Sequence, residues 1–270
     1  CGRTPNPCIA CNRYVKWESL LKRSLDIGAD YIATGHYARI RQLDNGRYTI
    51  CNSVTAAKDQ TYALYNLTQE QLKRTLMPVG EYSKDEVRKI ASDIGLRVAH
   101  KPDSQDICFV KDGDYASFLE EYTGKKVPEG NFVTRDGKVI GRHKGIIHYT
   151  IGQRRGLGIP AASRLYVCEI SPKTNTVVLG DNADLFSSEL EAESVNLISV
   201  DSLAEPKRVT AKIRYRHKEQ PATAWQTPDG ILHVKFDEPQ RAITKGQAVV
   251  MYDGDEVVGG GVINKIYSQS

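Results

Sequence analysis

The chain lacks several features, and each absence narrows the class of protein. No apolar run approaches the roughly 18 residues that span a bilayer, and no signal peptide precedes the fold, so we expect no membrane partner. Six cysteines among 270 residues are too few for a disulfide scaffold. This favours a reducing cytoplasm, where paired cysteines are more often metal ligands or catalysts. Because the first residue is Cys1 and not methionine, we interpret the chain as partial.

Acidic residues are missing from two basic stretches, residues 141–155 and 207–218. Both carry several Lys and Arg with histidine and interleaved tyrosine, a mixture that suits a phosphate backbone and stacked bases. A solvated charged face is the plainer interpretation of either stretch alone. Two of them in a chain with a net charge of +4 keep both interpretations open.

The first third of the chain has the pattern of an α/β protein. Apolar residues recur at helical spacing before a glycine that suits a helix end: Trp17, Leu20, Leu21 and Leu25, then Gly28. A short apolar run at 31–33 then leads into Thr34, Gly35 and His36, as a buried parallel strand and its loop do. Ligands of α/β sheets bind beyond the carboxyl ends of strands, where Gly35 and His36 would lie.

Two capping boxes predict the next helices, one starting at Thr68 and one at Ser83. The second helix carries an apolar stripe that predicts a buried face: Val87, Ile90, Ala91 and Ile94. A strand at 107–110 and a helix at 115–122 follow. Beyond about residue 131 hairpin turns and alternating residues replace helices, and they predict a small all-β barrel at the C-terminus.

Cys8 and Cys11 form a CxxC pair just before a helix, where the helix dipole favours the thiolate. A metal clip, a redox pair and a nucleophile all use this spacing. A structural zinc module normally needs a second ligand pair, which the sequence lacks. Cys51 and Cys168 lie in strand-like apolar stretches and are expected in the core. The position of Cys108 leaves core and site equally open.

Long motifs make the sequence resemble the tRNA-specific 2-thiouridylases (MnmA/TrmU family) over essentially its whole length. The motifs occur in family order: GRTPNPCIACNRYVKW, ADYIATGHYAR, KDQTYALYNL, KPDSQDICF, YTIGQRRGLGI, KIRYRH and GGGVI. The resemblance implies the C-terminal part of a PP-loop (adenine nucleotide alpha hydrolase-like) α/β domain, then a small central domain and a C-terminal all-β barrel. The expected boundaries are 1–112, with part of the central domain inserted around 74–96, then 113–187 and 188–270.

The same resemblance implies a cytoplasmic transferase that consumes ATP with Mg²⁺ to adenylate the wobble uridine of tRNA, and then replaces oxygen with sulfur at C2. It makes Cys11 the nucleophile and Cys108 the persulfide carrier, with a disulfide between them during turnover. It assigns Gly35 to ATP. It assigns the following residues to tRNA: Asn6, Pro7, Cys8, His36, Lys58, Asp59, Gln60, Arg214, Tyr215 and Gln247. A cysteine desulfurase or sulfur-relay protein is the implied sulfur donor.

Two departures from the family pattern leave alternatives open. The Ser-Gly-Gly-x-Asp-Ser loop that holds pyrophosphate is absent from this sequence, so we expect it upstream of Cys1 and expect the chain alone to be inactive. A non-catalytic tRNA-binding fragment is then the competing interpretation. Cys8 stands where many members have Asp. Cys8, Cys11 and Cys108 are enough to hold a [4Fe–4S] cluster with one open iron, which is an alternative route to thiolation.

Overall fold

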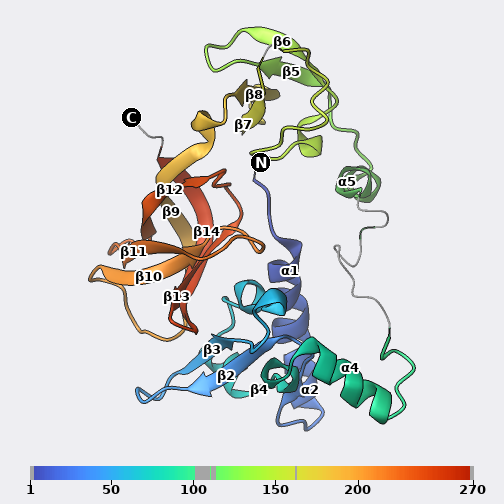
Figure 1. Cartoon of the computed structure of the whole chain (residues 1–270), viewed down its shortest axis with the longest axis vertical. Helices are drawn as coiled ribbons and strands as arrows, with labels where there is room; N and C mark the ends of the chain where they lie inside the picture. The colour runs from blue at the N-terminus through green and yellow to red at the C-terminus, as the bar shows by residue number, and fades with distance from the viewer. Residues whose placement is uncertain (1–2, 101–109, 111–113, 162, 268–270) are drawn as a thin grey trace.

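A computed structural model describes residues 3–100, 110, 114–161 and 163–267. The chain forms an N-terminal α/β region, a small separate sheet with one helix, and a large β-barrel, as Figure 1 shows. None of the helices in the described ranges is long and apolar enough to cross a membrane.

A continuous helical stretch opens the fold. It consists of α1 (Pro7–Ala10), a π-helix η1 (Cys11–Leu20) and α2 (Leu21–Asp26). Asn6 caps the stretch, since its Oδ1 accepts hydrogen bonds from the backbone N of Cys8 at 3.0 Å and of Ile9 at 3.4 Å. The predicted helix is therefore confirmed. Leu20, which we expected on the apolar face, is instead exposed, because the wider π turn rotates the i+3 position away from Trp17.

The predicted strand at 31–33 is confirmed as β1 (Ile32–Ala33), which pairs in parallel with β4 (Thr75–Leu76). Between them lies α3 (Gln69–Lys73), whose expected capping box is present. The same holds for α4 (Lys84–Asp93). The apolar stripe of α4 is not buried as predicted, because no described element packs over its outer end. The side chains of Ile90 and Ile94 are 44% and 67% exposed.

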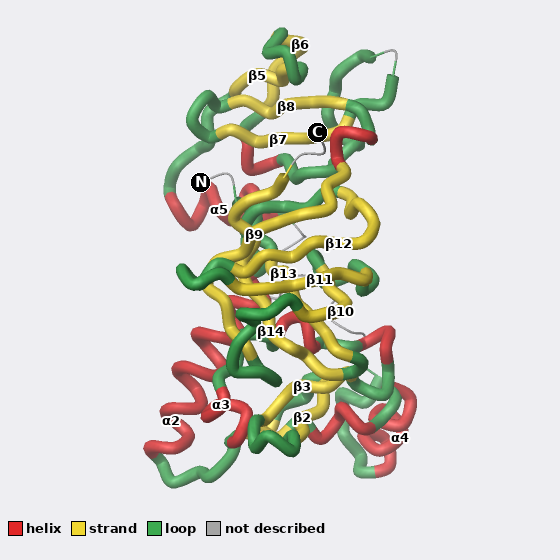
Figure 2. The backbone as a smooth tube through the Cα atoms, turned by 90° about the vertical axis from the view of Figure 1, so that its left-hand side faces the viewer, coloured by secondary structure: helices red, strands yellow, loops and turns green. Residues whose placement is uncertain are grey.

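The barrel closes through six strands, and a hairpin of the N-terminal region extends its sheet (Figure 2). The sheet order is β13-β10-β11-β12-β9-β14-β3-β2, and β13 also pairs with β14. The predicted C-terminal β-barrel is thus confirmed. Its strands are β9 (Phe186–Leu197), β10 (Lys207–Lys212), β11 (Gln220–Gln226), β12 (Leu232–Arg241), β13 (Ala248–Asp253) and β14 (Glu256–Tyr267), and the added hairpin is β2 (Ala38–Gln42) and β3 (Tyr48–Asn52).

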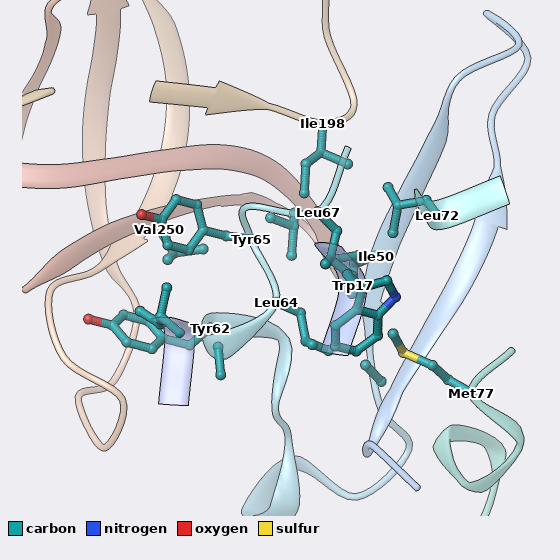
Figure 3. Packing of buried hydrophobic residues seen from close by; sticks show 14 of the residues in the cluster. Trp17, Ile50, Tyr62, Leu64, Tyr65, Leu67, Leu72, Met77, Ile198 and Val250 are labelled. Atoms are coloured by element: carbon teal, nitrogen blue, oxygen red, sulfur yellow. The ribbon is translucent and has the colours of Figure 1, made fainter. Parts of the chain in front are cut away.

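One hydrophobic core joins the barrel to the N-terminal region (Figure 3). Trp17, Tyr62 and Tyr65 pack in the same cluster as Val250 and Tyr252 of the barrel. A Cβ added to Gly260 of β14 would lie 2.4 Å from the carbonyl O of Val249 and 2.7 Å from the Tyr65 ring. Only a glycine permits this close approach, so the two regions form one packed unit.

The small sheet has the order β6-β5-β8-β7 and its own core around Phe132 and Leu179. Its strands are β5 (Gly130–Val133), β6 (Val139–His143), β7 (Tyr166–Ser171) and β8 (Thr176–Gly180). Helix α5 (Tyr115–Thr123) precedes it, as predicted. Short 3₁₀ turns complete the described structure: η2 (Ala56–Lys58), η3 (Thr61–Ala63), η4 (Pro78–Glu81), η6 (Ile146–His148) and η7 (Ala183–Leu185). The predicted strand at 107–110 falls almost wholly outside the described residues.

Candidate functional site

A cleft of about 900 Å³ lies between the N-terminal region and the barrel. It brings together five residues that the resemblance had singled out from distant parts of the sequence: Gly35, Lys58, Asp59, Gln60 and Tyr215. Basic side chains complete its wall: Lys84 from α4, and Lys212, Arg216, His217 and Lys218 from the barrel. The excess of positive charge over Asp59 and Glu219 suits a polyanion such as a nucleic-acid backbone.

The second basic stretch of the sequence divides into two parts in the structure. Lys207 and Arg208 on β10 pair with Asp253 on the adjacent β13 and Asp237 on β12, each at 2.7 Å. This half is a solvated charged face, as the plainer interpretation held. In the other half, Lys212 and residues 215–218 line the cleft and fit the nucleic-acid interpretation.

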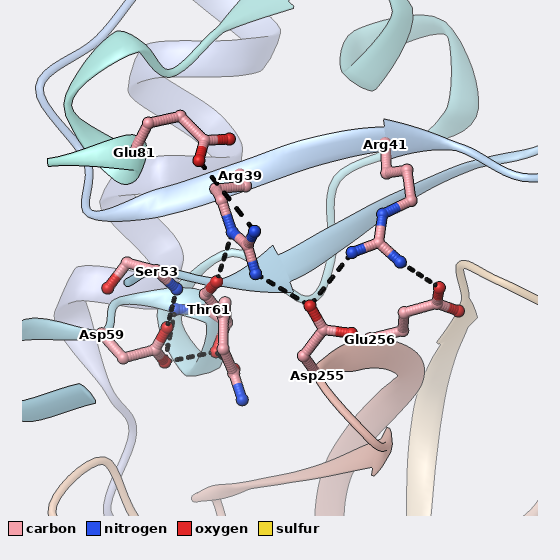
Figure 4. Close-up of polar contacts among 9 residues, drawn as sticks. Arg39, Arg41, Ser53, Asp59, Thr61, Glu81, Asp255 and Glu256 are labelled. Atoms are coloured by element: carbon pink, nitrogen blue, oxygen red, sulfur yellow. Dashed lines mark hydrogen bonds and ion pairs between the residues drawn. The ribbon is translucent and has the colours of Figure 1, made fainter. Parts of the chain in front are cut away.

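The loop at 58–60 is held in a fixed shape by its own contacts. The Asp59 carboxylate accepts hydrogen bonds from the backbone N of Ser53 at 3.1 Å and of Thr61 at 3.2 Å, as drawn in Figure 4. Gln60 Oε1 accepts a hydrogen bond from the N of Tyr37 at 2.9 Å. The hydroxyl of Tyr215 reaches across from the barrel and donates to the carbonyl O of Asp59 at 3.2 Å. The cleft is therefore preformed on this side.

The helical turn from Cys8 to Cys11, called the cysteine turn below, lies near the same cleft. Burial first, and then the nearby Asp59 and Cys8, raise the pKa of Tyr215, so Cys8 lies within electrostatic range of this residue of the cleft wall. The N–H of Cys11 donates to the carbonyl O of Cys8, so the two cysteines sit one turn apart. Cys8 is exposed and Cys11 is half-buried. Pro7 and the capping residue Asn6 shape this turn.

Gly35 follows β1 at its carboxyl end and faces the cleft. A Cβ added there would meet no atom within 4 Å, unlike the crowded Gly260. The backbone of Gly35 is therefore open to a ligand that approaches closely, which is the role that glycines fill beside bound nucleotides.

His36 is buried beside this opening and is held on both ring nitrogens. Lys16 Nζ lies 3.2 Å from its Nε2, Thr34 Oγ1 lies 2.9 Å from its Nδ1, and the Trp17 ring packs 5.4 Å away. Burial, reinforced by the Lys16 charge, lowers the pKa of His36 to about 4. His36 is thus neutral at pH 7, and only 8% of it is exposed.

Arg214 and Gln247 make intramolecular contacts. The Nη2 of Arg214 donates to the carbonyl O of Ile151 at 3.1 Å, to that of Ala242 at 2.8 Å and to Thr244 Oγ1 at 2.6 Å. Gln247 Nε2 donates to the carbonyl O of Thr4 at 2.7 Å. Both residues tie separate segments together, and their expected contacts with tRNA remain predictions.

Cys51, Asp255 and Glu256 are the group of metal-ligand type that the described ranges contain. Arg39 binds Asp255 at 2.8 Å and Arg41 binds Glu256 at 2.9 Å (Figure 4). The carboxylates are already neutralised, and burial raises the pKa of Cys51 to about 11. This group therefore forms ion pairs that join the β2–β3 hairpin to β14 and its turn. Cys51 is fully buried and Cys168 is half-buried, close to the core positions predicted.

Cys108, the expected partner of Cys11, lies outside the described residues, and so does the third thiol of the cluster alternative. The described cysteines form no disulfide with one another. Sequence reasoning missed Lys16 and Thr34, which hold His36. Thr34 was visible beside Gly35 and His36 in the strand-end motif, whereas nothing in the sequence pattern pointed to a π-helix that presents Lys16.

Three family models match the chain. The tRNA methyl transferase HUP domain matches residues 1–112, the tRNA methyl transferase PRC-barrel domain matches residues 116–181, and the aminomethyltransferase beta-barrel domain matches residues 187–263. These matches confirm the fold class: a HUP domain, a central domain and a C-terminal β-barrel. The HUP match starts at residue 1, so the interpretation that an upstream part of that domain is missing gains no support.

Curated relatives are similar over nearly the whole chain. The tRNA-specific 2-thiouridylase MnmA of Lachnoclostridium phytofermentans is 62% identical over 264 residues, which are 98% of this chain and 74% of that protein. The proteins of the same name from Clostridioides difficile and Acetivibrio thermocellus are 57% and 59% identical. Those matches cover 98% and 97% of this chain, and 73% of each relative.

Proposed function

Because the chain belongs to the tRNA-specific 2-thiouridylases, an enzyme family of tRNA sulfurtransferases, we propose that it places sulfur on C2 of the wobble uridine of tRNA. The observation that carries the proposal is the cleft, which collects Gly35, the loop at 58–60 and Tyr215 beside the cysteine turn. Its basic wall supports binding of the tRNA backbone, and we assign tRNA contacts to the exposed part of that wall first.

ATP is the proposed co-substrate, with Mg²⁺, and the match to a HUP domain supports this. The O2 of uridine is a poor leaving group until adenylation, with loss of pyrophosphate, converts it to an AMP ester. We place the nucleotide against the open backbone of Gly35. His36, held neutral by burial and by Lys16, shapes the wall behind it without repelling the lysine.

Sulfur transfer follows in two proposed steps. The terminal sulfur of a Cys108 persulfide attacks C2, and AMP leaves with the electron pair of the C2–O bond. The Cys11 thiolate then attacks Cys108 Sγ, which forms a Cys11–Cys108 disulfide and releases the thiolated base. A thiol reductant must supply two electrons to restore both cysteines, and a cysteine desulfurase or relay protein reloads the persulfide.

A [4Fe–4S] cluster remains the second candidate route, because Cys8 and Cys11 present two thiols on one turn. Thiolates are the ligands such clusters prefer, and an open iron would supply bound hydrosulfide. Cys8→Asp removes one of these thiolates and introduces the residue that many family members carry. Anaerobic iron uptake by the wild type that Cys8→Asp loses would favour this route. A wild type that binds no iron and still thiolates removes it.

The division of the chain is part of the proposal. We assign residues 1–112 to the catalytic domain, with a central-domain insertion around 74–96, residues 113–187 to the central domain and 188–270 to the barrel. We place the protein in the cytoplasm.

The test is thiolation of unmodified tRNA by wild type and cysteine variants, with 2-thiouridine measured by mass spectrometry. Cys11→Ser and Cys108→Ser should be inactive with unchanged tRNA affinity, because affinity comes mainly from phosphate contacts. Cys168→Ser is the matched control, a half-buried cysteine far in sequence from the site, and should remain active. Normal activity of Cys11→Ser would end the nucleophile assignment. Binding of tRNA by a wild type that makes no 2-thiouridine would favour the non-catalytic alternative.

A further inference from the structure

The barrel is hydrogen-bonded to the chain segment just ahead of the cysteine turn. The backbone N of Thr4 donates to the carbonyl O of Lys245 at 2.9 Å, and the carbonyl O of Thr4 accepts from Gln247 Nε2 at 2.7 Å. Both polar groups of the Thr4 backbone are thus bonded to one short loop, residues 245–247. Figure 1 shows this N-terminal segment running beside the barrel to reach α1.

Gly246 allows the loop at 245–247 to approach the backbone of Thr4 this closely. Its φ is +89°, and an added Cβ would lie 2.8 Å from the Cβ of Arg3 and 2.9 Å from the N of Thr4. Any side chain there would push the segment away. Arg3 also pairs with Glu193 at 2.5 Å, but both side chains are more than one third exposed, so this ion pair contributes little.

The loop at 245–247 is itself hydrogen-bonded to the barrel. The N of Gly246 donates to the carbonyl O of Ile263 at 2.8 Å, and the N of Ile263 donates to the carbonyl O of Gln247 at 2.8 Å. The N of Gln247 also donates to the carbonyl O of Thr244 at 3.2 Å. The loop therefore extends the pairing of β13 with β14 and can act as a rigid support.

Little freedom remains between Thr4 and Cys11. Pro5 and Pro7 each fix one φ angle. Asn6 is bonded to the first turn through Oδ1, and Cys11 is bonded back to Cys8. A displacement of Thr4 is therefore passed on to the Cys8–Cys11 turn and is not absorbed by a flexible linker.

We propose that Gln247 is a positioning residue: with Gly246, it anchors Thr4 so that the barrel sets where Cys8 and Cys11 stand beside the cleft. This rests on the proposed function for the importance of Cys11, but the anchor itself is a matter of structure. The anchor is an intramolecular role of Gln247 that the resemblance does not imply, and the expected contact of Gln247 with tRNA stays a separate prediction.

The experiment compares Gln247→Glu with Gln226→Ala. The first variant keeps the size of the side chain and replaces the donor to Thr4 by a carboxylate oxygen. The second removes a barrel glutamine that likewise donates from Nε2 to a backbone carbonyl, that of Gly230 at 3.0 Å, away from the N-terminal segment. Three quantities are measured: amide hydrogen exchange of residues 8–12, tRNA affinity, and the single-turnover thiolation rate at saturating tRNA.

For Gln247→Glu we expect faster exchange at residues 8–12 and a rate lowered about tenfold to a hundredfold, as for a misplaced reacting group. The affinity for tRNA should stay within about twofold, since phosphate contacts supply most of it. Gln226→Ala should match the wild type in all three. Weaker tRNA binding with unchanged exchange would overturn the proposal in favour of an RNA contact. Faster exchange with a normal rate would also overturn it. If the wild type itself does not thiolate, the proposed function fails, and exchange still decides whether the anchor exists.

Discussion

Lys16 Nζ lies 3.2 Å from Nε2 of the buried His36. A lysine ammonium can only donate, so Nε2 must be the acceptor, and Nδ1 carries the proton that is donated to Thr34 Oγ1. The structure thus specifies both the charge and the tautomer of the imidazole beside Gly35. Protonation of His36 would place two cations in contact in a dry environment.

Stability should fall as acid is added because of His36. Its pKa is lowered to about 4 in the folded state, against 6.5 when unfolded, so the unfolded chain binds the extra proton between these values. The contribution is complete above pH 6.5 and is lost as the pH falls towards 4, at most about 3 kcal/mol. Urea unfolding at pH 7.5 and pH 4.5 measures it. His36→Gln should flatten this dependence.

Lys16→Met should raise the pKa of His36, because it removes the second cause of the lowered value. The rise should be incomplete, since burial is the larger cause and remains. Imidazole NMR titration reports the pKa directly. Lys22→Met, which removes an exposed lysine of the following helix, is the control. A His36 pKa that does not move in Lys16→Met would show that the 3.2 Å contact has no electrostatic effect.

Arg214→Ala should change the stability of the protein, whereas Arg216→Ala should change its binding of tRNA. Arg214 donates to three internal acceptors, so its loss should lower the free energy of unfolding by about 1–3 kcal/mol. Arg216 is exposed and lines the cleft. Its loss should spare stability and reduce the log–log salt dependence of tRNA binding by about one contact. Thermal unfolding and filter binding at several salt concentrations separate the two. A reduced salt slope in Arg214→Ala without loss of stability would instead support the expected contact of Arg214 with tRNA.

Gly35→Ala and Gly260→Ala form a second contrasting pair. A Cβ at Gly260 would collide with the Val249 carbonyl and the Tyr65 ring, so the variant should unfold at lower temperature or fail to fold. A Cβ at Gly35 meets nothing within 4 Å, so stability should be kept and ATP affinity should fall. Calorimetry and nucleotide titration test both effects. Undiminished ATP binding by a stable Gly35→Ala would remove Gly35 from the nucleotide site.

Local signals in the sequence were reliable where the structure is determined locally. The capping boxes at Thr68 and Ser83 and the hairpin turns form as predicted, because their hydrogen bonds join residues only a few positions apart. The stripe on α4 was misjudged as buried. Periodicity identifies an apolar face, but whether another element covers that face is decided by the rest of the fold.

The sequence identified only part of the site, because some of its contacts are also decided by the rest of the fold. Motifs located Gly35, the loop at 58–60 and Tyr215, and the cleft gathers them. The inward turn of Arg214 and the grip of Gln247 on Thr4 depend on contacts across more than 60 and 240 positions of sequence. Lys207 and Arg208 of the acid-free run at 207–218 pair with acids on other strands of the sheet, which a linear pattern does not reveal.

The shared core of Trp17, Tyr62, Val250 and Tyr252 also bears on how the chain matures on the ribosome. The rings of Tyr62 and Tyr65 cannot be buried fully until strands near the C-terminus have been made, because they contact Ala248 and Gly260. At roughly 5–20 residues per second, this leaves a nascent chain with exposed apolar surface for on the order of ten seconds or more. Such a chain is a natural client for chaperones, and loss of its last strands would unfold the catalytic half as well as the barrel.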